Sequence, residues 1–116
     1  MKIAVIGSNM IDLITYIDRM PKEGETLEAP DFKMGFGGKG ANQAIAASKF
    51  ESDVMMVSKV GDDLFGENTI KNLKENGINT DFVTIQKNKA SGVAPIFVEK
   101  NSKNSILIIK GANKDL

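Results

Sequence analysis

The stretch MGFGGKGANQA, from Met34 to Ala44, decides how the rest of this chain is interpreted. It places four glycines within six positions, Gly35–Gly40, and then runs into an alanine-rich segment without helix breakers. Glycine loses more conformational freedom on folding than any other residue, so such a cluster marks a place where the backbone must approach something closely. We therefore expect a tight turn that leads directly into a helix over residues 41–50.

The segments on either side of this turn predict a parallel α/β core. Ile3–Ile6 and Asp53–Gly61 are short apolar runs typical of strands that are buried in a sheet, and residues 80–85 form a third such run. With the helix over residues 41–50 between the first two strands, this order corresponds to a βαβ unit.

A second helix is predicted between the second and third strands. Apolar or small side chains recur there at helical spacing, at Phe65, Thr69, Ile70 and Leu73. Asp62 or Asp63 can cap the start of this helix, and Gly77 lies where a left-handed residue commonly ends one.

Two further pieces interrupt the α/β pattern. Short antiparallel strands are expected near residues 13–17 and 26–36, with a turn marked by Pro21 and Gly24. A second hairpin is expected within residues 91–110, around the polar turn KNSKN. The sequence therefore predicts one domain over residues 1–116, in which a parallel sheet with flanking helices carries a small antiparallel β lid at about residues 13–36 and 91–110.

The composition excludes several classes of chemistry. The 116 residues include no cysteine and no histidine, which excludes thiol nucleophiles, disulfides, the usual zinc sites and serine–histidine pairs. The formal net charge is +0, and Arg19 is the single arginine, so no basic stripe favours nucleic acid. Apolar runs are short, whereas a membrane helix needs about 20 apolar residues. We expect a cytoplasmic protein with no nucleic-acid or membrane partner and no metal site in this chain.

The glycine cluster allows three interpretations, and the first two are a dinucleotide-binding site and a loop without a ligand. Gly35, Gly37 and Gly40 fit the dinucleotide fingerprint G-x-G-x-x-G, and Asp53 follows at about the distance of a ribose-binding acid. However, that fingerprint should follow the first strand directly, and its acid should end the second strand, so the context does not fit. The other reading is a loop whose glycines only allow a helix to pack tightly.

The third reading is a site for a ligand rich in hydroxyl groups or phosphate. The glycines would bring the backbone within hydrogen-bonding distance, and the following helix would direct free N–H groups and a positive dipole end toward the ligand. Lys39 and Asn42 add polar side chains. A polyol also needs an acceptor, and Asp12, soon after the first strand, can accept from two neighbouring hydroxyls. These residues together favour the polar-ligand site.

At this point the motifs resemble those of a known family. GGKGANQA is similar to the N-terminal signature of the ribokinase family, the PfkB-type sugar kinases. The likeness extends over the whole chain, through the segments VIGSNMID, GETL, VSKVGDDLFGENTIKNLKENGI, SGVAPIFV and IIKGAN. It implies the N-terminal part of a ribokinase-like α/β domain, truncated before the family's second half.

The resemblance implies ATP-dependent phosphorylation of D-ribose, or a related pentose, at the 5-hydroxyl. It assigns hydrogen bonds with the sugar to Asp12, Gly38, Lys39, Gly40 and Asn42, and an apolar wall to Ala94, Ile96 and Ile108. In the family the lid closes over the sugar and also pairs between subunits, so a homodimer through the β lid is expected.

One departure from the family concerns Met10. Many bacterial ribokinases carry asparagine at this position, where it contacts the sugar. Methionine cannot supply that polar contact, which makes the preference for ribose less secure. Asn9 is adjacent, but it should point to the other side of the strand.

The larger departure is the absence of the family's second half. The resemblance places the catalytic base, the ATP and Mg²⁺ sites and any monovalent cation there, so no catalytic residue is expected in this chain. The 116-residue chain alone is therefore predicted to be inactive. The alternative is a non-catalytic sugar-binding or dimerising module that ends at Leu116.

Overall fold

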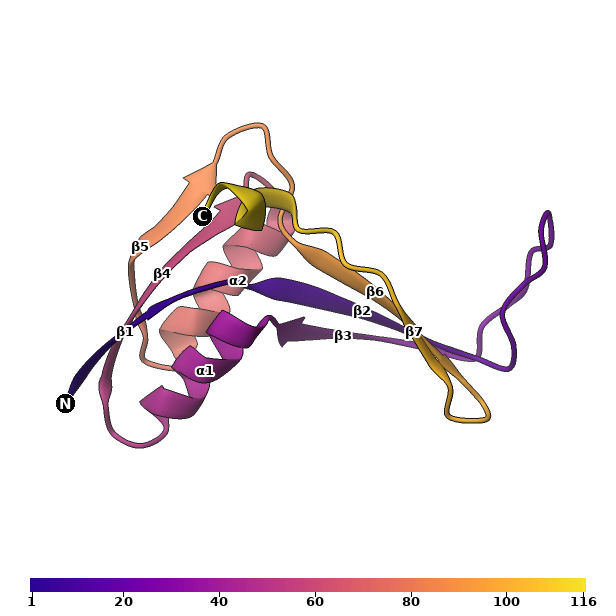
Figure 1. Cartoon of the computed structure of the whole chain (residues 1–116), viewed down its shortest axis with the longest axis horizontal. Helices are drawn as coiled ribbons and strands as arrows, with labels where there is room; N and C mark the ends of the chain where they lie inside the picture. The colour runs from indigo at the N-terminus through magenta and orange to yellow at the C-terminus, as the bar shows by residue number, and fades with distance from the viewer.

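The computed structural model describes all 116 residues, and its strands form two separate sheets (Figure 1). The first sheet is parallel, has the order β1-β4-β5 and consists of β1 (Lys2–Ile6), β4 (Asp53–Gly61) and β5 (Asn79–Gln86). Parallel neighbours need crossover connections, and a helix supplies each of them. The parallel sheet predicted from the sequence is therefore confirmed.

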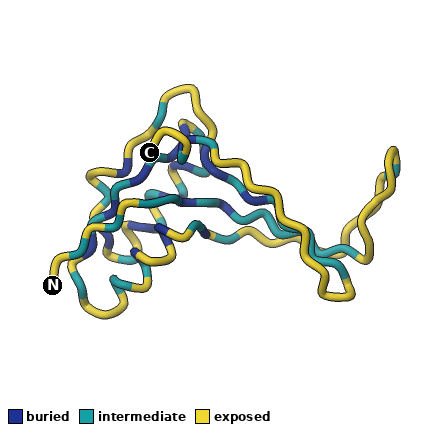
Figure 2. Tube along the Cα trace, viewed as in Figure 1, coloured by how far each residue is buried: buried dark blue, intermediate teal, exposed yellow.

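The two helices, α1 (Lys39–Ser48) and α2 (Leu64–Glu75), bury one face of this sheet. Alternate side chains of β4 point toward them, and these form one core with residues from both helices. The core consists of Ala41, Ala44, Val54, Met56, Val60, Leu73, Ile78 and Val83. Figure 2 shows that the buried segments lie in the body of the molecule and not in the projecting arm.

The ends of α2 follow the sequence signals. Asp63 caps the helix, because its Oδ1 accepts a hydrogen bond from the Gly66 N–H at 2.8 Å. Gly77 has a φ of 76°, which is the left-handed conformation expected after a helix end. Of the two candidate caps, Asp62 makes no such bond and remains exposed.

The second sheet is the lid, with the strand order β3-β2-β6-β7. Its strands are β2 (Met10–Ile17), β3 (Asp31–Gly37), β6 (Val93–Glu99) and β7 (Asn104–Ile106). The pairs β2–β3 and β6–β7 are antiparallel, as predicted, but β2 and β6 pair in parallel and join the two hairpins into one sheet. This parallel pair was not predicted, because its strands are far apart in sequence and each hairpin pattern is local.

Several element boundaries differ from the prediction. Helix α1 begins at Lys39 rather than at residue 41, and β2 begins at Met10 rather than near residue 13. Strand β3 begins only at Asp31, so residues 18–30 form a long loop. After β7, the chain keeps one bridge between Val93 and Ile109 and then forms the 3₁₀ helix η1 (Gly111–Asp115), which was not predicted.

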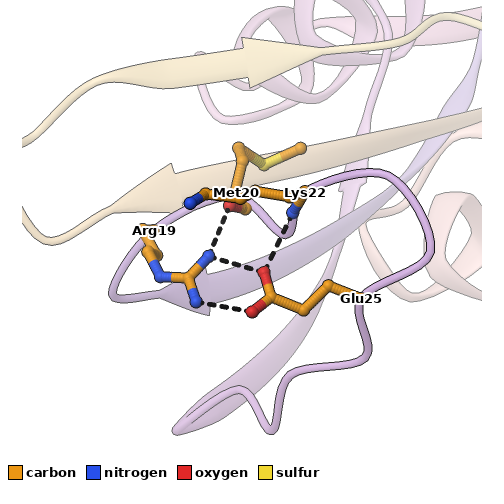
Figure 3. Close-up of polar contacts among 4 residues, drawn as sticks. All are labelled: Arg19, Met20, Lys22 and Glu25. Carbon is orange, nitrogen blue, oxygen red and sulfur yellow. Dashed lines mark hydrogen bonds and ion pairs between the residues drawn. The ribbon is translucent and has the colours of Figure 1, made fainter.

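The lid extends away from the core as an arm, so that the molecule measures 50 × 33 × 18 Å (Figure 1). Most of its tip is exposed (Figure 2). Arg19 binds Glu25 through two hydrogen bonds, of 2.6 and 2.7 Å, and the Lys22 N–H donates to the same carboxylate (Figure 3). The bond from Arg19, with that from Lys22, lowers the pKa of Glu25 to about 2.

Neither helix of the structure has the length and apolar character that a membrane span requires.

Candidate sugar-binding site

A cavity of about 520 Å³ lies where the lid meets the start of α1. Its lining comes from the loop after β1, from β2, from the glycine turn and the start of α1, from the second lid hairpin and from η1. The lining residues are Ser8, Met10, Asp12, Gly38, Lys39, Asn42, Ala94, Ile96, Ile106, Ile108, Lys110 and Asn113. The structure thus brings together eight of the nine residues predicted for sugar binding, from segments more than 90 residues apart.

The ninth residue, Gly40, does not line the cavity. A Cβ atom on Gly40 would lie 2.7 Å from the Gly7 Cα, because the first turn of α1 crosses directly over the end of β1. Gly40 is buried in this crossing. Its position corresponds to the packing interpretation of the glycine cluster.

Close packing also accounts for the two glycines before Lys39. A Cβ on Gly37 would lie 2.7 Å from the Asp12 Oδ2, so this glycine leaves room for the Asp12 carboxylate. Gly38 has a φ of 96°, and a Cβ there would lie 2.7 Å from the Asn9 Cα. The glycines therefore bring the turn against the protein's own backbone, and in doing so they place the side chains of Lys39 and Asn42 at the cavity.

The first turn of α1 has backbone donors that no side chain caps. The Ala41 N–H donates to the Ser8 carbonyl and the Asn42 N–H to the Gly38 carbonyl, both at 2.9 Å. The N–H groups before Ala41 have no intrahelical acceptor, and the positive end of the helix dipole lies beside them. This end of the cavity favours oxygen atoms of a ligand.

Asp12 is the single carboxylate of the cavity lining. It is half-buried, and this burial raises its pKa above the ordinary value of 3.8. No protein group donates a hydrogen bond to its side chain, so both oxygens remain available as acceptors. Beside it in β2, the half-buried Met10 adds an apolar side chain on the same face of the strand.

The lid supplies an apolar wall opposite these polar groups. Ala94 and Ile96 lie on β6, and Ile106 is paired with Ile96 across the second hairpin. Ile108 lies two residues further along the same face and is 65% exposed. Ile106 was missed by the sequence reading, although strand alternation from Ile108 could have found it.

The other missed residues are Ser8, Lys110 and Asn113, which come from turns and from η1, where no periodic signal exists. Asn9, in contrast, points away from the cavity as predicted. Its Nδ2 donates to the Ser58 Oγ and to the Lys59 carbonyl, both at 2.8 Å. No group of three or more side chains of the types that bind metal ions occurs in the structure.

The dinucleotide reading fails on the position of the motif. Gly35 and Gly37 lie in β3, which is a lid strand and not the first strand of the parallel sheet. Asp53 begins β4, whereas a ribose-binding acid would be found at the carboxyl end of that strand.

Comparison with known protein families gives a match that covers the whole length of this chain. The model of the pfkB family carbohydrate kinases matches residues 1–116. A deoxyribokinase from Salmonella typhi is 69% identical over 116 residues, and a ribokinase from Dictyostelium discoideum is 46% identical over 111. These matches cover 100% and 96% of this chain but 38% and 35% of the relatives.

Solved structures agree with this match. Arabidopsis thaliana ribokinase complexed with ribose and ATP superposes with a TM-score of 0.90 and 36% identity, over 95% of this chain and 36% of that one. Ribokinase from Giardia lamblia gives a TM-score of 0.91 and 36% identity, over 99% of this chain and 37% of that one. The chain therefore spans well under half the length of the relatives it matches.

Proposed function

This chain belongs to the pfkB family of carbohydrate kinases, and from that premise we propose that it forms the sugar-binding part of a pentose kinase. The observation that carries the proposal is the cavity itself, in which the unpaired carboxylate of Asp12, polar side chains that include Lys39 and Asn42, and an apolar wall lie around one space. The relatives reported above are ribokinases and a deoxyribokinase, and they support a pentose as the substrate.

In the proposed complex, Asp12 accepts hydrogen bonds from two neighbouring sugar hydroxyls. Lys39 donates, and the Asn42 carboxamide both donates and accepts, so the hydroxyls keep partners on both sides. The carbon–hydrogen face of the sugar lies against Ala94 and Ile96. Leaving a buried sugar hydroxyl without a partner would cost about 1–3 kcal/mol, which is why such a polar set discriminates against other ligands.

The proposed reaction transfers the γ-phosphoryl group of ATP to the 5-hydroxyl of the pentose. The hydroxyl oxygen forms a bond to phosphorus, the bond to ADP breaks, and the hydroxyl proton passes to a base. We place this base, and the ATP, Mg²⁺ and monovalent-cation sites, in the part of a full-length kinase that this chain does not cover. The lid's contribution is to exclude water from the phosphoryl group.

Among pentoses, Met10 favours one without a 2-hydroxyl as a second candidate substrate. A thioether is a weak acceptor and offers no donor, so a sugar hydroxyl beside Met10 loses a hydrogen bond on binding. A methylene group at the same place would gain apolar contact instead. The 69% identical relative is a deoxyribokinase, which supports 2-deoxyribose beside ribose.

We also propose a homodimer through the lid. Phe32, Met34 and Phe36 lie on the face of β3 opposite Asp12 and are 54%, 49% and 45% exposed. Strand β3 is the outer strand of the lid sheet, so its second edge has no partner within the chain. A second lid packed on this face would cover both the apolar side chains and the edge.

The function is tested by measuring ADP formation by the complete protein in the presence of ATP, Mg²⁺ and one sugar at a time. Ribose, 2-deoxyribose, fructose and adenosine form the panel. We expect turnover with one or both pentoses and little with the others. Turnover with fructose or adenosine alone would contradict the pentose assignment, and sugar binding without any ADP formation would favour the non-catalytic module.

A further inference from the structure

The side chain of Asn113, in η1, uses its whole carboxamide to hold other parts of the backbone. Its Oδ1 accepts from the Asn9 N–H at 3.0 Å, and its Nδ2 donates to the Asn9 carbonyl at 2.8 Å. The same Nδ2 donates to the Lys110 carbonyl at 2.8 Å. The Asn9–Asn113 pair joins residues that are 104 positions apart.

These contacts lie where the lid hairpins leave the core. Strand β2 begins directly after Asn9, and the chain returning from β7 reaches η1 through Lys110. Strand β6 begins after Gly92, where a Cβ atom would collide with the Asn113 Nδ2. The Ile11 N–H donates to the Gly92 carbonyl at 3.0 Å. Asn113 thus contacts the bases of both hairpins at once.

The other end of this network is rigid. Asn9 is 1% exposed, and its side chain is bonded to Ser58 and Lys59 of β4. The Ser58 hydroxyl in turn donates to the Gly7 carbonyl at 2.7 Å. Ser58 is also 1% exposed. A lid segment attached to Asn9 is therefore attached to the centre of the parallel sheet.

We propose that Asn113 is a positioning residue that fixes the base of the lid, where β2 and β6 begin side by side, to η1, so that the lid closes as one body. By holding Asn9, it keeps Met10 and Asp12 directed into the cavity. This inference rests on the proposed function for its role in the reaction. The mechanical coupling itself rests on the hydrogen bonds of Asn113 and on the close approach of Gly92.

Loss of the carboxamide should loosen the base of the lid from η1, although β2 and β6 would stay paired with each other. The Asn9 N–H and carbonyl would lose their partners, and the paired starts of β2 and β6 would move more freely relative to the core. Water would then reach the closed site and attack the γ-phosphorus in place of the sugar hydroxyl, which gives ADP and inorganic phosphate. The expected sign is ADP formed in excess of sugar phosphate.

The test compares Asn113→Ala and Gly92→Ala with the control Asn104→Ala in the complete protein. Asn104 is an exposed asparagine of β7, and its side chain makes no hydrogen bond with the core. We expect the first two variants to raise KM for the pentose about tenfold, with KM for ATP little changed. The reason is that misplacing Met10 and Asp12 should weaken sugar binding by about the worth of one net hydrogen bond. The ratio of ADP to sugar phosphate should rise above that of the wild type.

The variant Asn113→Asp tests whether the hydrogen bonds of the Asn113 carboxamide, and not the volume of its side chain, hold the base of the lid. Aspartate keeps the size of the side chain and can accept from the Asn9 N–H, but its second oxygen would face two carbonyls. It should therefore restore neither the KM for the pentose nor the ratio of the two products. Full rescue by aspartate would overturn the inference.

Amide hydrogen exchange in the sugar-free protein gives a readout that does not depend on activity. Exchange at Ile11 and Val93 should be faster in Asn113→Ala and Gly92→Ala and unchanged in Asn104→Ala. Unchanged exchange at both amides in the first two variants would overturn the coupling. If the wild type phosphorylates no pentose, the proposed function fails, and the exchange data still decide the coupling.

Discussion

At the scale of single residues, Met10 and Asp12 make opposite demands on a ligand. Both lie on the same face of β2, where one offers an apolar surface and the other two acceptor oxygens. A sugar that places hydroxyls on one side and a methylene on the other would satisfy both. Substitution of Met10 should therefore change the selectivity between sugars more than substitution of the apolar wall does. The side chains of the wall would contact every pentose in the same way.

Met10→Asn is predicted to shift the preference of the complete protein from 2-deoxyribose toward ribose. Asparagine can both donate to and accept from a 2-hydroxyl, which is worth roughly 0.5–1.5 kcal/mol, or up to about tenfold in the ratio of kcat/KM values. The measurement is the kcat/KM for each sugar, with Ile14→Val on the same strand as the control. An unchanged ratio would mean that the 2-position does not face Met10.

Individual residues also show what the sequence could and could not predict. Asp12, Lys39 and Asn42 belong to motifs with a recognisable chemistry, and the structure gathers them in one cavity. Gly40 belongs to the same motif, yet its position is explained by contact with Gly7. A sequence motif cannot separate residues that face a ligand from those that let the motif fold, because the approach of β1 to α1 is a tertiary contact.

At the scale of elements, the base of the second lid hairpin is joined to the cap of α2. Asp63 Oδ1 accepts from the Gly66 N–H and from the Ser91 hydroxyl, and Oδ2 accepts from the Ser91 N–H at 2.8 Å. Burial alone would raise the pKa of Asp63, but these hydrogen bonds, first those from Ser91, lower it below the ordinary value of 3.8. The carboxylate therefore serves a helix and a lid segment together.

Asp63→Ala is predicted to destabilise the complete protein by about 2 kcal/mol or more, since it removes a helix cap and leaves Ser91 without its partner. Because the folded-state pKa is lowered, this stabilisation is present above pH 3.8 and is lost as the pH falls through the folded-state value. Urea unfolding at several pH values measures both effects.

The matched control is Asp62→Ala, which removes a neighbouring exposed carboxylate that caps nothing. It should change the free energy of unfolding by a few tenths of a kcal/mol at most, as is usual for surface positions. Equal losses for the two variants would show that the capping network is not what stabilises this region.

Elements with a local pattern were predicted well, and those that depend on distant partners were not. The strands and helices of the parallel sheet follow from apolar runs, caps and helical spacing. The parallel pair β2–β6 and the helix η1 have no local signal, because residues about 80 positions apart form the first and contacts with Ala90 and Asn9 hold the second. The cavity lies where those two elements meet, so its full lining could not be predicted.

At the scale of the whole molecule, one face of the parallel sheet remains uncovered, and its edge strands β1 and β5 each have one edge without a partner strand. Strand β1 is an edge strand, and Ile6 at its end is 72% exposed. Phe82 of β5 lies on the same face as Ile6, because both pair with Val57 of β4, and it is 55% exposed. Contiguous apolar surface of this kind normally packs against further protein.

The isolated 116-residue chain is therefore predicted to self-associate and to release no ADP from ATP in the presence of ribose or 2-deoxyribose. Sedimentation velocity over a range of concentrations measures the first property, and a coupled ADP assay measures the second. A monodisperse chain with pentose-dependent ADP release would refute this prediction.

The lid face makes a separate prediction about assembly. In the complete protein, Met34→Lys should weaken the proposed dimer, because it places a charge among Phe32 and Phe36 on the apolar face. Lys33→Met, on the opposite face of the same strand, is the control. Sedimentation equilibrium should show a higher dimer dissociation constant for the first variant alone, and equal constants would contradict a lid-mediated dimer.

The central claim is that the cavity around Asp12 binds the pentose, and calorimetric titration of the complete protein with ribose and 2-deoxyribose tests it most directly. Asp12→Asn should lose at least about tenfold in affinity, because an acceptor for two hydroxyls is replaced by a mixed donor and acceptor. Since burial raises the pKa of Asp12, ionisation costs stability above pH 3.8, so this variant should be at least as stable as the wild type at pH 7. Wild-type affinity in a folded Asp12→Asn protein would contradict the account.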